Sequence, residues 1–169
     1  MRVIQPLVTI PLGIVAERRK TNGPWADTIW RPASILLGAP DTAAWTKLTD
    51  DGERATFYVG EAVIELYRTE VSNYRDNLMM ESPLVWVSLQ ETGGDPPYGS
   101  PNATVDPAEG EAFASAAGII TETLPMLDLI HAHVDRFVAE YYVERAFSKR
   151  KRDRANLEAM GWHKPERLK

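Results

Sequence analysis

The helix expected near the C-terminus carries the residues that come closest to a metal site. Asp128 and His131 are three residues apart and His131 and Asp135 are four apart, so all three can share one helix face. Carboxylate and imidazole groups at this spacing can bind a divalent metal. However, a single helix supplies all of them, the neighbouring His133 included, and no second group of ligands is evident elsewhere. The pattern therefore favours a solvent-facing polar stripe, and we predict no metal.

Two carboxylates that could serve acid–base chemistry, Glu61 and Glu65, lie on an expected strand, but nothing around them in the sequence supports that use. The chain has no Gly-rich phosphate loop, no G-x-S-x-G elbow and no H-E-x-x-H motif. It also has no cysteine, which excludes disulfides, thiolate nucleophiles and cysteine-ligated metal centres. The sequence therefore predicts no catalytic residue and no cofactor, and indicates a protein that is not an enzyme.

Tryptophan and arginine side chains near an expected edge strand are the best candidates for binding a partner protein, because both types are enriched at interface hot spots. Indoles also fill cores, so the two tryptophans are left between interface and core. The charge run around Arg18 and Arg19 could bind an anion or a partner carboxylate, although a charge run at a strand end is usually only solvated. The turn after Tyr74 could be a binding corner or a local hydrogen-bond network. The candidate residues are Arg18, Arg19, Trp25, Asp27, Trp30, Arg31, Tyr74, Arg75, Asp76, Asn77, Lys149, Arg150, Lys151 and Arg152.

A small-molecule site is the alternative to a protein interface. Its pocket would be built from Trp30, Arg31, Tyr74 and Arg75. Aromatic faces and guanidinium groups together suit an anionic, planar ligand such as a pterin phosphate.

The net charge of −5 hides an asymmetry between the body of the chain and its end. Up to Val143, 10 Lys and Arg stand against 20 Asp and Glu, and from Glu144 onward 9 stand against 4. An acidic body disfavours a nucleic-acid-binding domain, which is usually basic on its folded face. The basic tail alone would bind nucleic acid electrostatically, without specificity for a base sequence. We predict that Lys149–Lys169 is dispensable for folding and needed for partner binding.

Strand and helix patterns must position these residues. Residues 9–19 and 25–37 read as strands, the second with an edge position or bulge at Pro32. Thr69 or Ser72 could cap a short helix over residues 73–80. The other expected elements are a hairpin turn at 50–53, strands at 55–58, 62–67 and 119–124, a central buried strand at 83–89, a mobile loop at 90–102, a helix from Pro107 capped by Asp106, and a long helix after Pro125 with an apolar stripe.

These elements predict an α+β fold. We expect a mostly antiparallel sheet of about five or six strands, with the long C-terminal helix packed on one face. Residues 1–148 would form a single domain and 149–169 a basic tail. No segment approaches the roughly 20 apolar residues that span a bilayer, and the N-terminus lacks the pattern of a signal peptide. We therefore expect a cytoplasmic protein with no membrane association.

Four segments resemble, in order, a bacterial family catalogued as domain of unknown function 3305: VAERRKTNGPWADTIWRPASILLGAP, ELYRTEVSNYRDNL, PLVWVSL and VERAFSKRKRDR. The W-x-D-x-x-W-R-P and Y-R-D-N-L pieces are its most specific parts. Members are often encoded beside subunits of molybdenum- or tungsten-dependent formate dehydrogenase, which implies an accessory role. In the family, histidines are more frequent where this chain has Tyr141-Tyr142. A sulfuration chaperone would be expected to need a cysteine, so assistance here would be by binding.

The leading interpretation is a non-catalytic accessory or interaction protein that assists assembly or regulation of such a formate dehydrogenase. Its partner would be a protein, with a formate dehydrogenase subunit as the first candidate and self-association left open. An anionic-ligand-binding protein is the alternative.

Overall fold

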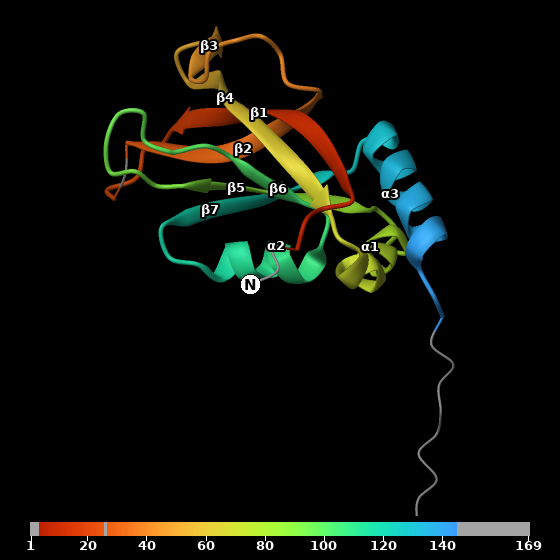
Figure 1. Ribbon diagram of the computed structural model, residues 1–169. Helices are drawn as coiled ribbons and strands as arrows, with labels where there is room; N and C mark the ends of the chain where they lie inside the picture. Colours follow the sequence, from red (N-terminus) through yellow and green to blue (C-terminus); the bar gives the residue numbers. More distant parts are fainter. Residues whose placement is uncertain (1–3, 26, 145–169) are drawn as a thin grey trace, which may run out of the picture.

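The computed structural model describes residues 4–25 and 27–144 of the chain (Figure 1). The predicted tail, its candidates Lys149, Arg150, Lys151 and Arg152, and the domain boundary at 148 lie outside these residues. Along the chain the elements are β1 (Val8–Lys20), β2 (Thr28–Leu37), β3 (Thr46–Asp50), β4 (Arg54–Leu66), the 3₁₀ turn η1 (Arg68–Glu70), α1 (Val71–Leu78), β5 (Leu84–Gln90), β6 (Asn102–Thr104), α2 (Pro107–Ser115), β7 (Ile119–Pro125) and α3 (Asp128–Tyr141).

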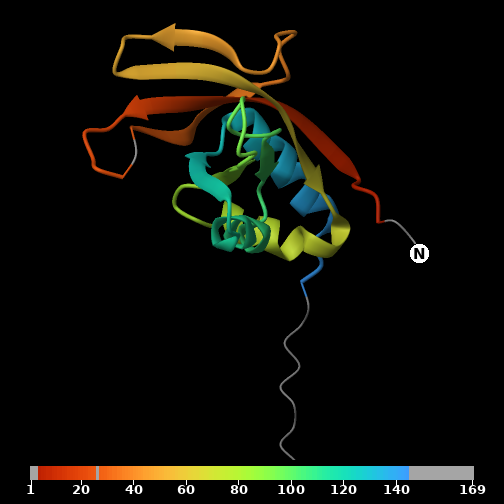
Figure 2. The same ribbon diagram turned by 90° about the vertical axis from the view of Figure 1, so that its left-hand side faces the viewer.

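The strands form two antiparallel sheets, where the sequence predicts a single one. Sheet A has the order β2-β1-β4-β3 and sheet B the order β6-β5-β7. Figure 2 shows sheet A lying across one side of the molecule, with sheet B and the helices beneath it. β2 packs beside β7 and β4 beside β6 without joining the ladders, so the two sheets enclose a shared core. The mixed α+β class and the antiparallel pairing are confirmed.

The core is built from the inward side chains of both sheets. In β1, Leu12 and Ile14 are fully buried, and in β5 so are Val85 and Val87. β5 is central in sheet B, as its nearly continuous apolar run predicts. Pro32 lies where the pairing of β1 with the edge strand β2 shifts register, which confirms the predicted bulge.

The loop between β5 and β6, expected to be mobile, is tied down by its own hydrogen bonds. The Thr92 hydroxyl donates to the Pro96 carbonyl at 2.6 Å, and the Gly99 N–H donates to the Gln90 carbonyl at 2.9 Å. The loop also buries Tyr98 in the core. Its position is therefore fixed by the same packing that fixes the sheets.

The C-terminal helix α3 has the predicted apolar stripe, with Ile130, Val134 and Phe137 buried. Its main neighbour is α1 instead of the face of a sheet (Figure 1). At the start of α2, the Asp106 carboxylate accepts hydrogen bonds from the N–H groups of Ala108 and Glu109, which confirms the predicted cap. None of the described helices has the length and apolar character that crossing a membrane requires.

Helix α1 is held by side chains of the stretch for which the sequence leaves two alternatives open, a binding corner or a local hydrogen-bond network. Asn77 is fully buried, and its amide donates to the carbonyls of Leu84 and Val105 at 2.8 Å each. Its carbonyl accepts from the Leu84 N–H at 2.9 Å. The buried Tyr74 hydroxyl accepts from the Tyr67 N–H at 3.0 Å, and burial raises the pKa of Tyr74 to about 12. Of the two readings left open for this turn, the local hydrogen-bond network is present.

Replacing Asn77 with Ala is expected to lower the free energy of unfolding by about 2–4 kcal/mol, because it removes three hydrogen bonds to partly buried groups of Leu84 and a buried carbonyl of Val105. Urea denaturation measures the change. Asn102→Ala is the matched control, since Asn102 is exposed, and its effect should stay within about 0.5 kcal/mol. A loss below about 1 kcal/mol for Asn77→Ala would contradict this account.

Gly110→Ala should destabilise the protein although alanine is the better helix former by about 1 kcal/mol. A Cβ at Gly110 would lie 2.2 Å from Cγ of Trp86, since α2 packs directly on that indole. We expect a net loss of about 1–3 kcal/mol from overpacking, read from the same urea titrations. At Gly23 a Cβ meets nothing within 4 Å, so Gly23→Ala is the control. A more stable Gly110→Ala protein would show that α2 moves freely away from Trp86.

Candidate functional site

Basic side chains gather at one end of sheet A, where β1 ends and β4 begins. This end holds six of the nine Lys and Arg residues in the described part of an otherwise acidic body. We call it the basic end: Arg18, Arg19, Lys20, Arg31, Lys47 and Arg54. Acidic residues lie here too, so pairing decides which cations remain available to a partner.

On the inner face of the basic end, Arg18 lies over two aromatic rings. Its guanidinium carbon is 5.9 Å from the Trp30 ring centre and 5.5 Å from that of Phe57. Trp30 in turn contacts Trp45, with ring centres 5.5 Å apart, and Tyr98 at 6.1 Å. We call Trp30, Trp45, Phe57 and Tyr98 the aromatic cluster. Trp30, a candidate from the sequence, therefore packs within this cluster against the core.

The inner-face cations are largely neutralised. Lys47 Nζ lies 2.8 Å from Asp50 Oδ2, and Arg18 approaches the same oxygen at 3.9 Å. The hydrogen bond from Lys47 is the main reason that the pKa of Asp50 lies below its usual range. These ion pairs are partly exposed, so they orient the side chains more than they stabilise the fold.

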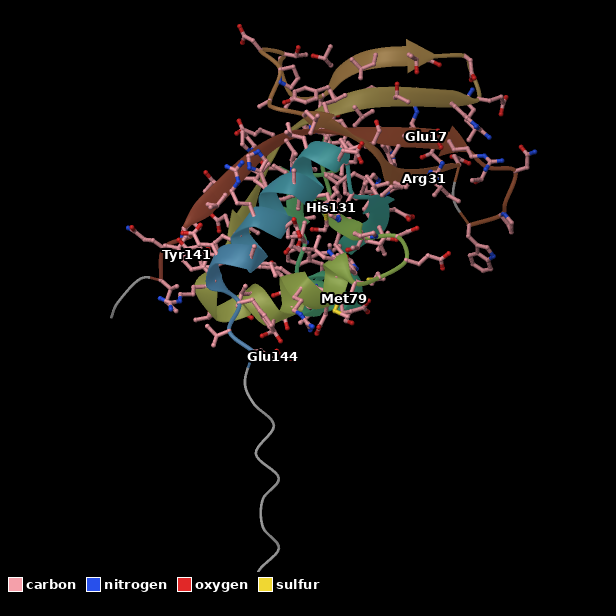
Figure 3. All side chains as sticks on the ribbon, turned by 90° about the vertical axis from the view of Figure 1, so that its right-hand side faces the viewer. Glu17, Arg31, Met79, His131, Tyr141 and Glu144 are labelled. Atoms are coloured by element: carbon pink, nitrogen blue, oxygen red, sulfur yellow. The ribbon has the colours of Figure 1, made fainter. Side chains whose placement is uncertain are left out.

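On the outer face, two arginines lie directly opposite each other. Successive residues of a strand point to opposite faces, so Arg19 faces away from Arg18. The register pairs Arg19 of β1 with Arg54 of β4, and both are exposed. Neither forms an ion pair with another described residue, whereas Arg31 is held by Glu17 at 3.2 Å (Figure 3). Asp51 is the carboxylate nearest in sequence to Arg54, and its pKa is held below its usual range by the N–H groups of Arg54 and Glu53 and, to a smaller extent, by the charge of Arg54. Like charges directly opposite each other destabilise a sheet, so this pair is available to a negatively charged partner.

Trp25 projects from the loop between β1 and β2 and is 95% exposed. Ile29, at the start of β2, is 56% exposed and pairs with Arg19 in the sheet. The backbone carbonyl of Asp27 accepts a hydrogen bond from the Thr21 N–H at 3.1 Å, which closes the base of this loop. The two tryptophans therefore take different positions: Trp30 packs in the aromatic cluster, and Trp25 stands in solvent on the loop that follows β1.

The four residues proposed for a small-molecule pocket fall into two separate groups among the described residues. Trp30 belongs to the aromatic cluster, while Tyr74 packs against Phe137 with ring centres 5.9 Å apart. Arg31 is engaged by Glu17, and Arg75 lies over Tyr142 at 4.7 Å. Asp76 is exposed beside Arg75, and Asn77 is buried.

The two glutamates noted in the sequence do line a common cavity, of about 390 Å³, between β4, β6 and α2. Glu109 joins Glu61 and Glu65 there, and the Tyr67 hydroxyl donates to Glu65, which raises the pKa of Tyr67. In residues 4–25 and 27–144 no group of three or more His, Cys, Asp or Glu side chains is placed to hold a metal ion. This holds for the polar stripe around His131 on α3 as well (Figure 3).

Sequence reasoning missed Arg54, Arg68 and Tyr142 as candidates. Arg54 follows the hairpin turn at residues 50–53, so pairing β4 back along β1 would have brought it beside Arg19. The spacing along the chain gives no comparable signal for Arg68 and Tyr142, because the cavity that both line forms only where η1 and α1 meet the end of α3.

Comparison with known proteins places the chain in one family. A model described as "Protein of unknown function (DUF3305)" matches residues 11–151, so the chain belongs to that family. No curated protein and no solved structure matches the chain.

The different positions of the two tryptophans predict different costs of truncation. Trp30→Ala should lower the free energy of unfolding by about 2–4 kcal/mol, since it removes the central ring of the aromatic cluster. Trp25→Ala should change it by less than about 0.5 kcal/mol. Thermal and urea unfolding of the two variants gives the comparison. Equal losses would show that Trp25 also packs in the folded protein.

Proposed function

We propose that this protein is a non-catalytic accessory protein that binds an acidic surface of a partner through the outer face of its basic end. The observation that supports it is the pair of exposed arginines Arg19 and Arg54, which lie directly opposite each other on β1 and β4. The exposed Ile29 pairs with Arg19 on the other side, and the loop that joins β1 to β2 carries Trp25, which is 95% exposed. Tryptophan and arginine are the residue types most enriched at interface hot spots. The contact surface comprises Trp25, Ile29, Arg19 and Arg54.

The electrostatics of the body support a defined orientation for that contact. The chain up to Val143 has a net negative charge, with 20 Asp and Glu against 10 Lys and Arg, so most of its surface repels an acidic partner. Only the basic end offers a local excess of unpaired cations on sheet A. Charge arranged in this way raises the rate of correct encounter and suppresses incorrect ones.

The partner we propose is a subunit of a molybdenum- or tungsten-dependent formate dehydrogenase, whose assembly or regulation the protein would assist. This choice rests on the genes that often neighbour those of the family. The proposal assigns no reaction to the chain itself, and a cytoplasmic location goes with it.

The test is affinity purification of tagged full-length protein from its native host while the host makes formate dehydrogenase. Wild-type protein is expected to recover a formate dehydrogenase subunit, with recovery falling as salt rises because the surface is exposed. The Arg19→Glu/Arg54→Glu variant should recover at least about tenfold less, as close charge pairs at an interface couple by about 1.5 kcal/mol or more. Arg136→Glu, an exposed arginine on α3, is the matched control and should recover as much as wild type.

Two outcomes would contradict the proposal in different ways. Recovery of no formate dehydrogenase subunit by wild-type protein would reject the partner. Equal recovery by wild type and the double variant would reject the surface.

The melting temperature of a single variant shows whether the arginine pair serves binding or folding. Arg54→Thr should melt at the wild-type temperature or above, because it removes a repulsive pair from the sheet.

A further inference from the structure

A second cavity, of about 540 Å³, lies where η1 and α1 meet the C-terminal end of α3. Its volume falls within the range of sites that hold small molecules. Figure 3 shows Tyr141 and Glu144 at this end of α3. We call the cavity the arginine–tyrosine groove; it is lined by Arg68, Thr69, Val71, Ser72, Tyr141, Tyr142 and Val143.

Two guanidinium groups lie over adjacent aromatic rings of this groove: Arg68 is part of the lining, and Arg75 lies outside the lining, over the ring of Tyr142. The guanidinium carbon of Arg68 lies 5.9 Å from the ring centre of Tyr141, and that of Arg75 lies 4.7 Å from the ring centre of Tyr142. Because the two tyrosines are consecutive in the chain, they bring the two arginines to the same end of α3. A guanidinium stacked on a ring keeps its N–H donors free at its edge and loses little freedom on binding an anion.

The charge of the groove differs from that of the other cavities between described residues. Its lining includes no Asp or Glu, whereas two other cavities are lined by Glu61, Glu65 and Glu109, or by Glu70, Asp106 and Glu109. Neither Arg68 nor Arg75 forms an ion pair within the part of the chain that the structure describes. The hydroxyl of Tyr141 is hydrogen-bonded to Glu140, which raises the pKa of Tyr141.

Hydroxyl groups complete the polar lining. The sequence suggests Thr69 or Ser72 as the cap of α1, but the cap residue is Glu70 and no side chain makes a capping hydrogen bond. Both residues instead line the groove. The paired N–H donors of an arginine guanidinium, together with nearby hydroxyl groups, suit the recognition of phosphate and carboxylate oxygens. A bare phosphate ion would fill only a minor part of the cavity, which leaves room for an organic group.

We propose that the arginine–tyrosine groove binds a small organic oxyanion of nucleotide size, with Arg68 and Arg75 holding its phosphate or carboxylate group. This is a site separate from the basic end, so it stands or falls independently of the proposed partner. The contact it requires is a guanidinium N–H donating to an oxyanion oxygen, assisted by the hydroxyls of Thr69 and Ser72.

Isothermal titration of the full-length protein tests the proposal with four probes: adenosine 5′-monophosphate, adenosine, citrate and inorganic phosphate. We expect the nucleotide or citrate to bind, inorganic phosphate to bind more weakly, and adenosine not to bind. Arg75→Gln and Arg68→Gln should each weaken binding by about tenfold or more, the loss expected for one charge-assisted donor. Arg75→Lys, which keeps the charge and loses the fork, should give an intermediate loss. Arg136→Gln, outside the groove, should leave binding unchanged.

The outcomes separate the possible sources of the oxyanion. Binding of the nucleotide alone supports a phosphate ester, and binding of citrate alone supports a carboxylate. Inorganic phosphate binding as tightly as either overturns the claim of an organic group. Dissociation constants weaker than about 10 mM for all of the anions, or equal weakening by Arg136→Gln, overturn the site. Circular dichroism of each variant confirms that the fold is retained when affinity is compared.

Discussion

The fold depends on one short helix whose polar side chains join elements that would otherwise meet only through apolar packing. Asn77 of α1 bonds to Leu84 at the start of β5, and Tyr74 receives the Tyr67 N–H at the end of sheet A. Asn73 donates to both carboxylate oxygens of Asp106, at 3.1 Å each, and Asp106 caps α2. Three side chains of one helix therefore fix how sheet A, sheet B and α2 are arranged. Since each partner is buried or partly buried, these bonds act in a low dielectric where leaving one unmade is costly.

Sequence patterns located most elements because local signals govern them: the apolar run of β5, the proline bulge in β2 and the Asp106 cap. The division into two sheets could not be predicted in the same way. It depends on β4 passing beside β6 without hydrogen bonds, a contact between distant segments that leaves the period-two pattern of each strand unchanged. The position of α3 against α1, and the fixed loop around Tyr98, arise from the same non-local packing.

The candidate site shows a similar limit. Trp25 and Trp30 belong to one motif, and the start of β2 separates them: Trp30 lies in the strand, paired with Arg18 on the inner face, and Trp25 lies in the loop before it. The pairing of Arg19 with Arg54 follows the register shift between Ile14 and Val15, where Gly60, with φ of 130°, lies opposite Ile14. A shift by one residue would turn every later side chain to the other face. The sequence singled out Arg19 and missed Arg54, because the bulge determines that these two arginines meet in solvent.

The closure of the two sheets also limits how copies of this chain can associate. An unpaired strand edge is a template for adding another strand, and proteins restrict it with short or charged edges. In the described chain β2 is flanked by β7, β4 by β6, and the remaining edge of sheet A is β3, which has five residues and carries Lys47 and Asp50. Strand addition is therefore confined to a short, charged segment. Long-lived oligomers of this fold would therefore have to form through contacts between side chains. Growth of fibres by strand addition is disfavoured, because little of the backbone edge is open to another copy.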